Sequence, residues 1–149
     1  MKKIFNLAEM EVFAQQLAQQ LGAGDVLLLD GDLGAGKTTF SQFLGRALGV
    51  KRTINSPTFN IIKSYRGSVL NFHHMDCYRL EDSEEDLGFD EYFNDDAVTV
   101  VEWSQFIEEY LPETFLKITI TVVNETERAL QLEAVGTHYE AIKETLEHV

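Results

Sequence analysis

The sequence predicts an α/β fold in which a mixed, mainly parallel sheet is flanked by helices and ends in a C-terminal antiparallel hairpin. Three observations support this prediction. A glycine-rich segment, residues 31–38, lies between an apolar run and a helical pattern. Two later apolar runs, residues 69–75 and 98–101, each end next to a carboxylate. The tail contains two strand-like runs joined by a polar turn, which is the pattern of a hairpin.

The composition indicates one compact domain, which we expect to span residues 1–149, because 44% of the residues are hydrophobic. The single cysteine, Cys77, excludes a disulfide framework and fits a reducing cytoplasm. The N-terminus lacks the apolar segment of a signal peptide, and no apolar run reaches membrane-spanning length. We therefore expect a cytoplasmic protein without a membrane partner.

The first helix is predicted to begin at Asn6, because Asn6 and Glu9 have the spacing of a capping box. One apolar face follows at intervals of three and four residues: Leu7, Met10, Ala14, Leu17 and Leu21. Glycines at positions 22 and 24 end the helix, which we interpret as scaffold.

Residues 31–38, Gly-Asp-Leu-Gly-Ala-Gly-Lys-Thr, fit the pattern G-x-x-x-x-G-K-[ST], the phosphate-binding loop of P-loop NTPases. Glycines let the backbone N–H groups point at phosphate oxygens, Lys37 brings a positive charge, and the Thr38 hydroxyl suits Mg²⁺. The apolar run at 26–29 and the helical spacing of residues 40–48 place the loop between a strand and a helix. The N-terminal end of that helix dipole also favours anions, so the segment predicts nucleotide binding.

The loop that follows contains two hydroxyl residues, Ser56 and Thr58, on either side of Pro57. In P-loop enzymes a hydroxyl at such a position senses the γ-phosphate and Mg²⁺. A plain turn that enters a strand at residues 59–65 is an equally favoured alternative.

Two carboxylates stand at predicted strand ends. Asp76 follows the strand at residues 69–75, which a turn at 66–68 precedes, and Glu102 follows the strand at residues 98–101. The carboxyl ends of the strands form the ligand side of an open α/β sheet. There the two side chains can hold Mg²⁺, its water shell or the attacking water. Either carboxylate could instead be structural, paired with Lys37 or capping a helix.

His73, His74, Asp76 and Cys77 are residue types that bind zinc, but successive residues of a strand point to opposite faces. We therefore favour ordinary core or edge histidines over a metal site.

The net charge of −13 argues against direct, tight binding of DNA or RNA, which normally requires a basic patch. Nine carboxylates lie between residues 81 and 96: Glu81, Asp82, Glu84, Glu85, Asp86, Asp90, Glu91, Asp95 and Asp96. The more frequent interpretation of such a run is a solvated helix face. The alternative is an acidic docking surface for a basic partner protein.

The remaining elements are predicted from local patterns. Residues 105–110 form a short helix closed by Pro112, and residues 116–123 and 129–135 form the hairpin. A last helix spans residues 138–146.

Four motifs occur together: residues 31–40, Ser-Pro-Thr-Phe at 56–59, His-Met-Asp-Cys-Tyr-Arg-Leu at 74–80 and Val-Glu-Trp at 101–103. In this order and spacing they resemble the bacterial TsaE family, formerly YjeE, small ATPases needed to form threonylcarbamoyladenosine on tRNA. The resemblance covers nearly the whole chain. Cys77 is one departure, because the family usually has an apolar residue there.

The resemblance implies a P-loop NTPase fold, ATP and Mg²⁺ as cofactors, and an ATPase activity that is weak in the isolated chain. It also implies that the chain acts with the TsaB and TsaD proteins and contacts tRNA only through that complex. In the family, ATP binding and hydrolysis are thought to reset the complex between turnovers.

The resemblance further implies roles for individual residues. The phosphate cradle would consist of Gly34, Ala35, Gly36, Lys37, Thr38 and Thr39. Thr38 and Glu102 would hold Mg²⁺, and Asp76 would organise the water of the metal or the nucleophile. Lys37, Asp76 and Glu102 would be the catalytic residues, with Trp103 supporting the region of Glu102. Thr58 would lie in a switch-like loop, and Arg128 near the adenine.

Two other functions use a similar loop. A P-loop kinase for a small molecule or nucleotide usually needs clustered lid arginines, whereas the five arginines here are scattered along the chain. A GTPase switch would need an Asn-Lys-x-Asp run and an Asp-x-x-Gly motif, and the sequence contains neither at the corresponding positions.

Overall fold

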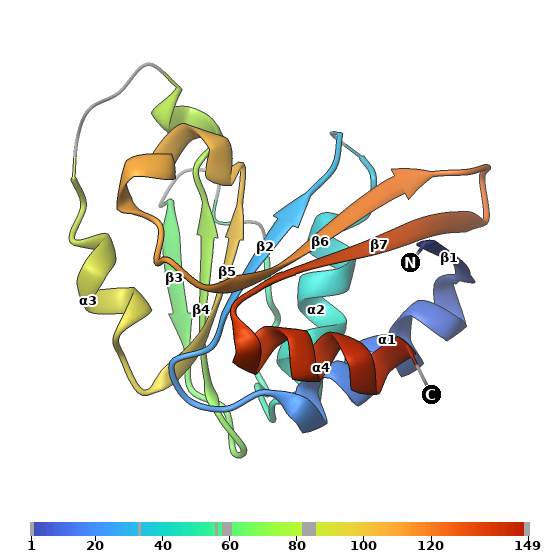
Figure 1. The fold of residues 1–149 in the computed structure, drawn as a ribbon, viewed down its shortest axis with the longest axis horizontal. Coiled ribbons are helices and arrows are strands. Elements are labelled where there is room, and N and C mark those ends of the chain that lie inside the picture. Colours follow the sequence, from blue (N-terminus) through green and yellow to red (C-terminus); the bar gives the residue numbers. More distant parts are fainter. Residues whose placement is uncertain (1, 33, 56, 58–60, 82–85, 148–149) are drawn as a thin grey trace.

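The computed structural model describes residues 2–32, 34–55, 57, 61–81 and 86–147. Its framework is a seven-stranded mixed sheet in the order β1-β7-β6-β2-β5-β4-β3 (Figure 1). The strands are β1 Lys2–Asn6, β2 Val26–Asp30, β3 Ile62–Tyr65, β4 Asn71–Asp76, β5 Ala97–Glu102, β6 Phe115–Val122 and β7 Glu127–Val135. The four central strands, β6, β2, β5 and β4, pair in parallel, and β3, β7 and β1 add antiparallel pairs at the two sides. The predicted mixed sheet and the C-terminal hairpin, β6–β7, are confirmed.

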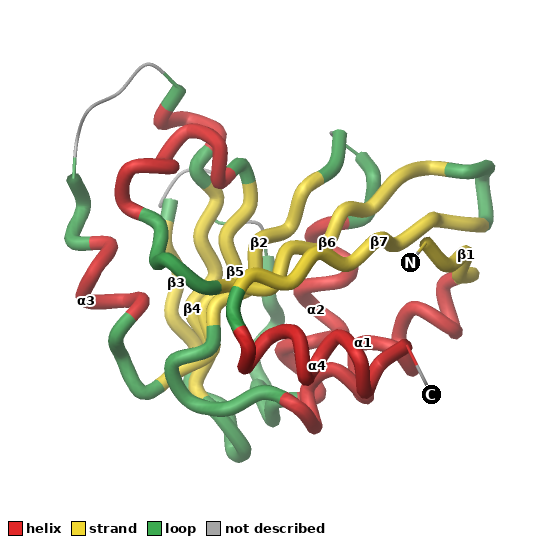
Figure 2. The backbone as a smooth tube through the Cα atoms, in the orientation of Figure 1, coloured by secondary structure: helices red, strands yellow, loops and turns green. Residues whose placement is uncertain are grey.

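Helices cover the two faces of the sheet unequally. The α-helices are α1 Leu7–Gln20, α2 Lys37–Ala47, α3 Phe89–Phe93 and α4 Thr137–Glu147, and the 3₁₀ segments are η1 Tyr78–Leu80 and η2 Ser104–Tyr110. Figures 1 and 2 show α1, α2 and α4 together on one side, whereas α3 and the 3₁₀ segments lie toward the other. Among the described residues, none of these helices combines the length and apolar character needed to cross a bilayer.

Helix α1 begins where the sequence predicts. The Asn6 side chain accepts a hydrogen bond from the Glu9 N–H at 2.8 Å, and the Glu9 side chain accepts one from the Asn6 N–H at 2.9 Å. This reciprocal pair satisfies two N–H groups that the first helical turn cannot pair internally. The predicted apolar face is buried from Met10 onward, but Leu7 is 61% exposed.

Strand β2 forms the centre of the sheet, with β5 on one side and β6 on the other, both parallel to it. Its four apolar residues, Val26–Leu29, are all buried. Leu27 and Leu29 pack into the core under α1, α2 and α4, and Val26 and Leu28 pack into the core on the opposite face. A continuous apolar run suits a parallel strand that is covered on both faces. The glycine-rich loop therefore starts from a buried strand at the centre of the sheet.

Three local predictions need correction. Strand β1 was not expected; its five residues precede a helix and form a strand only because β7 is there to pair with them. Strand β4 begins at Asn71 and not at Val69, because the N–H groups of Val69 and Leu70 donate to the Leu48 carbonyl. Residues 105–110 belong to a 3₁₀ segment, interrupted by non-helical backbone at Ile107.

The remaining boundaries differ only slightly from those expected. Strand β3 begins at Ile62, and residues 59 and 60, where the sequence predicted its start, lie outside the described residues. The last helix extends by one residue at each end of the predicted range.

Candidate functional site

The three glycines of the loop have backbone conformations that favour glycine. Gly31, Gly34 and Gly36 have φ values of +155°, +82° and +108°. At Gly31 there is also no room, because a Cβ would lie 2.6 Å from the Ile120 carbonyl oxygen. At Gly34 and Gly36 a Cβ would meet none of the described residues within 4 Å, so the loop is open on that side. At these two positions the backbone is therefore accessible from this space.

Helix α2 begins directly at this loop. Gly36 is its N-cap and provides no side-chain hydrogen bond. The first-turn N–H groups of a helix have no internal partners, and here they face the loop together with the positive end of the helix dipole. Thr38 and Thr39 stand in this first turn and are partly exposed. This donor set fits an anionic group such as a phosphate.

Lys37 is buried, with 6% exposure, and its side chain reaches across the loop to Gly31. Its Nζ donates to the Gly31 carbonyl at 2.7 Å and lies 4.0 Å from the centre of the Trp103 ring. Trp103 has a φ of +58°, which is uncommon for a residue other than glycine. The contact between Lys37 and Trp103 joins the loop to the end of β5. The family resemblance implied that Trp103 supports the region of Glu102, and nothing in the sequence indicated this contact with the lysine.

Asp76 and Glu102 are brought together as the sequence predicted. They are register partners at the carboxyl ends of the parallel strands β4 and β5, and both are buried, with 6% and 3% exposure. Burial, followed by the charges of Asp76 and Glu102, raises the pKa of the Cys77 thiol to about 12. The Cys77 N–H also donates to the Glu102 carbonyl at 3.0 Å. The thiol therefore stays protonated beside the two carboxylates at neutral pH.

The residues present fit Mg²⁺ better than a metal that needs a cage of protein ligands. Among the described residues there is no group of three or more histidine, cysteine or carboxylate side chains that could hold a metal ion. Mg²⁺ usually keeps several waters and takes one or two carboxylates together with phosphate oxygens. The hydroxyl of Thr38 and the carboxylates of Asp76 and Glu102 supply such a partial set.

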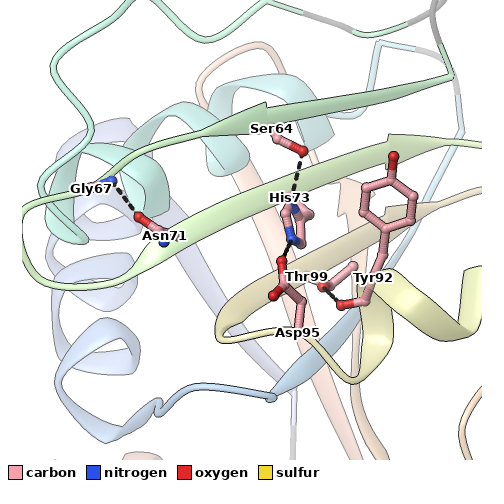
Figure 3. Close-up of polar contacts among 7 residues, drawn as sticks. All are labelled: Ser64, Gly67, Asn71, His73, Tyr92, Asp95 and Thr99. Carbon is pink, nitrogen blue, oxygen red and sulfur yellow. Dashed lines mark hydrogen bonds and ion pairs between the residues drawn. The ribbon is translucent and has the colours of Figure 1, made fainter.

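The two neighbouring histidines contact different groups, and Figure 3 shows the contacts of His73. His73 lies 2.8 Å from the Ser64 hydroxyl through Nδ1 and 2.7 Å from the Asp95 carboxylate through Nε2. The hydrogen bond from His73 is the main cause that lowers the pKa of Asp95. His74 instead lies 2.5 Å from Glu102 through Nε2. The histidines point to opposite faces of β4, as the strand geometry predicts, but the bond to Glu102 was not foreseen.

Arg128, in β7, connects the hairpin to the loop. Its Nε donates to the Ala35 carbonyl at 3.0 Å, and its Nη1 donates to the Asn124 and Glu127 carbonyls. A pocket of about 440 Å³ opens beside it. Its lining residues are Asn6, Leu7, Ala8, Met10, Gly36, Thr39, Glu125, Thr126 and Arg128. This volume is in the range of small-molecule pockets, and the pocket adjoins the glycine-rich loop and the first turn of α2 at Gly36 and Thr39.

Some predicted residues lie outside the described chain. Ser56 and Thr58, the two switch-like hydroxyl residues, are among them, as are Asp82, Glu84 and Glu85 of the acidic run. The described carboxylates of that run are all exposed: Glu81, Asp86, Asp90, Glu91, Asp95 and Asp96. Phe89 and Phe93, which alternate with them, are buried against the sheet, so this part has one solvated and one packed side.

Comparison with known proteins identifies relatives that cover most of the chain. A family model described as "Threonylcarbamoyl adenosine biosynthesis protein TsaE" matches residues 4–130. The tRNA threonylcarbamoyladenosine biosynthesis protein TsaE of Bacillus subtilis is 49% identical over 141 residues, 95% of this chain and 89% of that protein. The protein of the same name from Rickettsia felis is 38% identical over 126 residues, 83% of this chain and 73% of its own. The crystal structure of YdiB from Bacillus subtilis superposes with a TM-score of 0.85 at 41% identity, covering 99% of this chain and 94% of that one. The chain therefore has the predicted P-loop NTPase fold.

Proposed function

The chain belongs to the TsaE family, and from that premise we propose that it is an ATP-binding, weakly ATP-hydrolysing subunit of the bacterial system that forms threonylcarbamoyladenosine on tRNA. The names of its relatives support the pathway, and the geometry of the loop supports the nucleotide. The chemistry assigned to this chain is hydrolysis of the bond between the β- and γ-phosphates by water.

The observation that best supports this proposal is the continuity between the glycine-rich loop and the neighbouring pocket. Gly36 belongs to both, and the uncapped N-terminus of α2 lies between them. A nucleotide has the same division into a polyanionic end and a flatter, less charged end. We assign the phosphates to residues 34–39 and the nucleoside to the pocket beside Arg128.

Each side chain of the proposed site would have a separate role in the reaction. Lys37 would exchange the Gly31 carbonyl for phosphate oxygens, because an ammonium group binds an anion more strongly than a neutral carbonyl. Thr38 and Glu102 would hold Mg²⁺, and Asp76 would orient a metal-bound or attacking water. Bound Mg²⁺ would neutralise charge on the phosphate oxygens. Thr58 remains the proposed switch-like residue.

The partners follow from the family and from the charge of the chain. We propose that it works in the cytoplasm with the TsaB and TsaD proteins, and that these hold the tRNA. The net charge of −13 disfavours direct binding of nucleic acid, and the described carboxylates between residues 81 and 96, which are exposed, suit a basic protein surface. ATP binding and hydrolysis would then reset the complex between turnovers.

The rate of ATP hydrolysis, measured with the chain alone and with purified TsaB and TsaD, tests this function. We expect a low basal rate that rises with the partners and is lost in Lys37→Ala. Lys51→Ala is the matched control, because Lys51 is an exposed lysine outside the loop. A high basal rate that ignores the partners would favour an independent P-loop enzyme, such as a kinase. An unchanged rate in Lys37→Ala would contradict the assigned phosphate site.

A further inference from the structure

We infer that His74 is a positioning residue for Glu102: its Nε2–H holds the carboxylate in place at the end of β5. This inference rests on the proposed function, because it assumes that Glu102 takes part in ATP hydrolysis. It adds a residue that neither contacts the nucleotide nor belongs to the metal ligands proposed above.

The hydrogen bond between the two side chains is short and buried. Nε2 of His74 lies 2.5 Å from Oε2 of Glu102, with 0% and 3% of the two residues exposed. His74 is two residues before Asp76 on β4, so both side chains leave the strand on the same face. Asp76 is the register partner of Glu102. The Glu102 side chain is therefore anchored diagonally across two strands, beside the other carboxylate of the site.

The surroundings of His74 determine which nitrogen carries the proton. Its Nδ1 is fully buried and has no hydrogen-bond partner among the residues that the structure describes. A buried N–H without an acceptor is rarer than a buried acceptor without a donor, so Nδ1 is the bare nitrogen and Nε2 carries the hydrogen. The ring stacks on Phe72 with 5.9 Å between centroids, which restricts its rotation. His74 is thus a donor through Nε2 and has one available orientation.

An orphaned ring nitrogen in a packed core lowers stability, and an apolar side chain at this position would avoid that loss. Proteins retain such local conflicts mainly at functional sites. Among the described residues, no hydrogen bond reaches the second oxygen of Glu102, Oε1. With Oε2 held by His74, Oε1 is the oxygen that remains for a metal ion or a water molecule. Partners that orient ligating groups in this way typically change affinity or activity by about 10- to 100-fold when they are removed.

The first test compares ATP hydrolysis and ATP affinity in four single variants. His74→Leu removes the donor and keeps an apolar side chain, whereas His74→Gln places an amide N–H near the position of Nε2. Glu102→Gln tests the carboxylate itself, and His73→Leu is the matched control on the other face of β4. We expect His74→Leu to lower kcat by about 10- to 100-fold with little change in ATP affinity. His74→Gln should recover part of that loss, and His73→Leu should keep the wild-type rate.

The double variant His74→Leu/Glu102→Gln separates positioning from a general structural role. If His74 acts through Glu102, the double variant hydrolyses ATP as slowly as Glu102→Gln and no slower. If the rate losses of the two single variants instead multiply in the double variant, the inference is overturned. A wild-type rate in a folded His74→Leu protein would also overturn it. A Glu102→Gln protein with the wild-type rate would contradict the proposed role of Glu102 and the inference together. A slow Glu102→Gln protein beside a fast His74→Leu protein would contradict the inference alone.

A second readout uses the nucleotide-free protein. Nitrogen chemical shifts of the imidazole, measured by NMR, distinguish the Nε2–H from the Nδ1–H tautomer. We expect His74 to show the Nε2–H form. The Nδ1–H form would overturn the inference even if the variants were slow.

Discussion

Individual glycines of the loop are required for different reasons. At Gly34 and Gly36 the positive φ is the constraint, because the space around each is open. At Gly31 the conformation and the close approach of the Ile120 carbonyl both exclude a side chain. A substitution at Gly31 therefore strains the backbone and pushes β2 and β6 apart, whereas one at Gly34 acts on the loop alone.

Gly31→Ala tests this difference through stability. We expect it to lower the free energy of unfolding by about 1–3 kcal/mol, because an L-residue at this φ is strained and its Cβ meets a backbone oxygen that cannot move freely. Denaturant-induced unfolding measures the change. Gly22→Ala is the control, since Gly22 has no positive φ and a methyl group there would meet no described atom within 4 Å. Equal stability of the two variants would show that the Gly31 backbone and the Ile120 carbonyl tolerate a side chain.

The sequence could predict those site residues whose role depends only on their own position in a strand or loop. Asp76, Glu102 and Lys37 follow from the motif and from the strand ends, and the structure brings the two carboxylates together. The contacts Lys37–Trp103 and His74–Glu102 could not be derived in the same way, because each joins residues from different elements. The proximity of Asp76 to Glu102 was a usable signal for His74, which shares a face with Asp76 at a spacing of two.

At the scale of elements, predictability depends on whether an element is stabilised locally. Helix α1 has its own capping box, and β2 has a continuous apolar run, so both are predicted correctly. Strand β1 exists only through its pairing with β7, more than a hundred residues later. The 3₁₀ segment η2 begins directly after Trp103, which has a positive φ. No local sequence pattern reveals this backbone conformation, so the geometry of η2 could not be predicted either.

Asn6→Ala tests the local contribution of the capping box. We expect it to lower the free energy of unfolding by about 1 kcal/mol, because one first-turn N–H loses its acceptor. Glu9→Gln is the control, since glutamine keeps an oxygen that can accept from the Asn6 N–H. Thermal unfolding of the two variants gives the comparison. If Asn6→Ala and Glu9→Gln are equally stable, tertiary packing alone stabilises the start of α1.

The contact of Asp95 with His73 joins the end of α3 to β4 and should be sensitive to acid. His73 lowers the pKa of Asp95 in the folded chain from its ordinary value of 3.8. A carboxylate of this kind contributes stability above its ordinary pKa and loses it as the pH falls through the lowered value. We therefore expect the wild-type protein to exceed Asp95→Asn in unfolding free energy at pH 6.

The same difference should shrink as the pH falls below about 4, the region of the unperturbed aspartate pKa. Asp96→Asn removes the same charge from the exposed neighbouring residue and controls for net charge. Chemical denaturation of the three proteins at several pH values measures the effect. A difference that stays constant into the acid range would exclude the hydrogen bond between the Asp95 carboxylate and His73 as its cause.

At the scale of the whole molecule, one pocket draws residues from three distant parts of the chain. Asn6 and Leu7 come from the N-terminal end, Gly36 and Thr39 from the loop and α2, and Arg128 from the last hairpin. Ligand binding should therefore stabilise the entire fold and not only the loop. The net charge of −13 acts on the same scale, because it disfavours long-range attraction of nucleic acid to the molecule as a whole.

The thermal stability of the protein in the presence of ATP and Mg²⁺ tests this global coupling. At an ATP concentration about 100 times the Kd, we expect roughly 2.7 kcal/mol of added stability, because the proposed ATP site exists only in the folded chain. Arg128→Ala should require about ten times more ATP for the same shift, since it removes a charged group from the pocket wall. Arg52→Ala, a substitution outside the pocket, should behave like the wild type. An unchanged ATP requirement in Arg128→Ala would contradict the assignment of the nucleoside pocket.

The order of the strands also has a consequence for biosynthesis. The glycine-rich loop is synthesised early, but its strand β2 pairs with β5 and β6, which are synthesised later. Strand β1 likewise cannot pair until β7 has been synthesised. Arg128, in the wall of the pocket, is among the last parts of the site to be made. A nascent chain therefore cannot complete the proposed nucleotide site until the β6–β7 hairpin has emerged from the exit tunnel. Translation would thus delay nucleotide binding until residues 1–135 are available to fold.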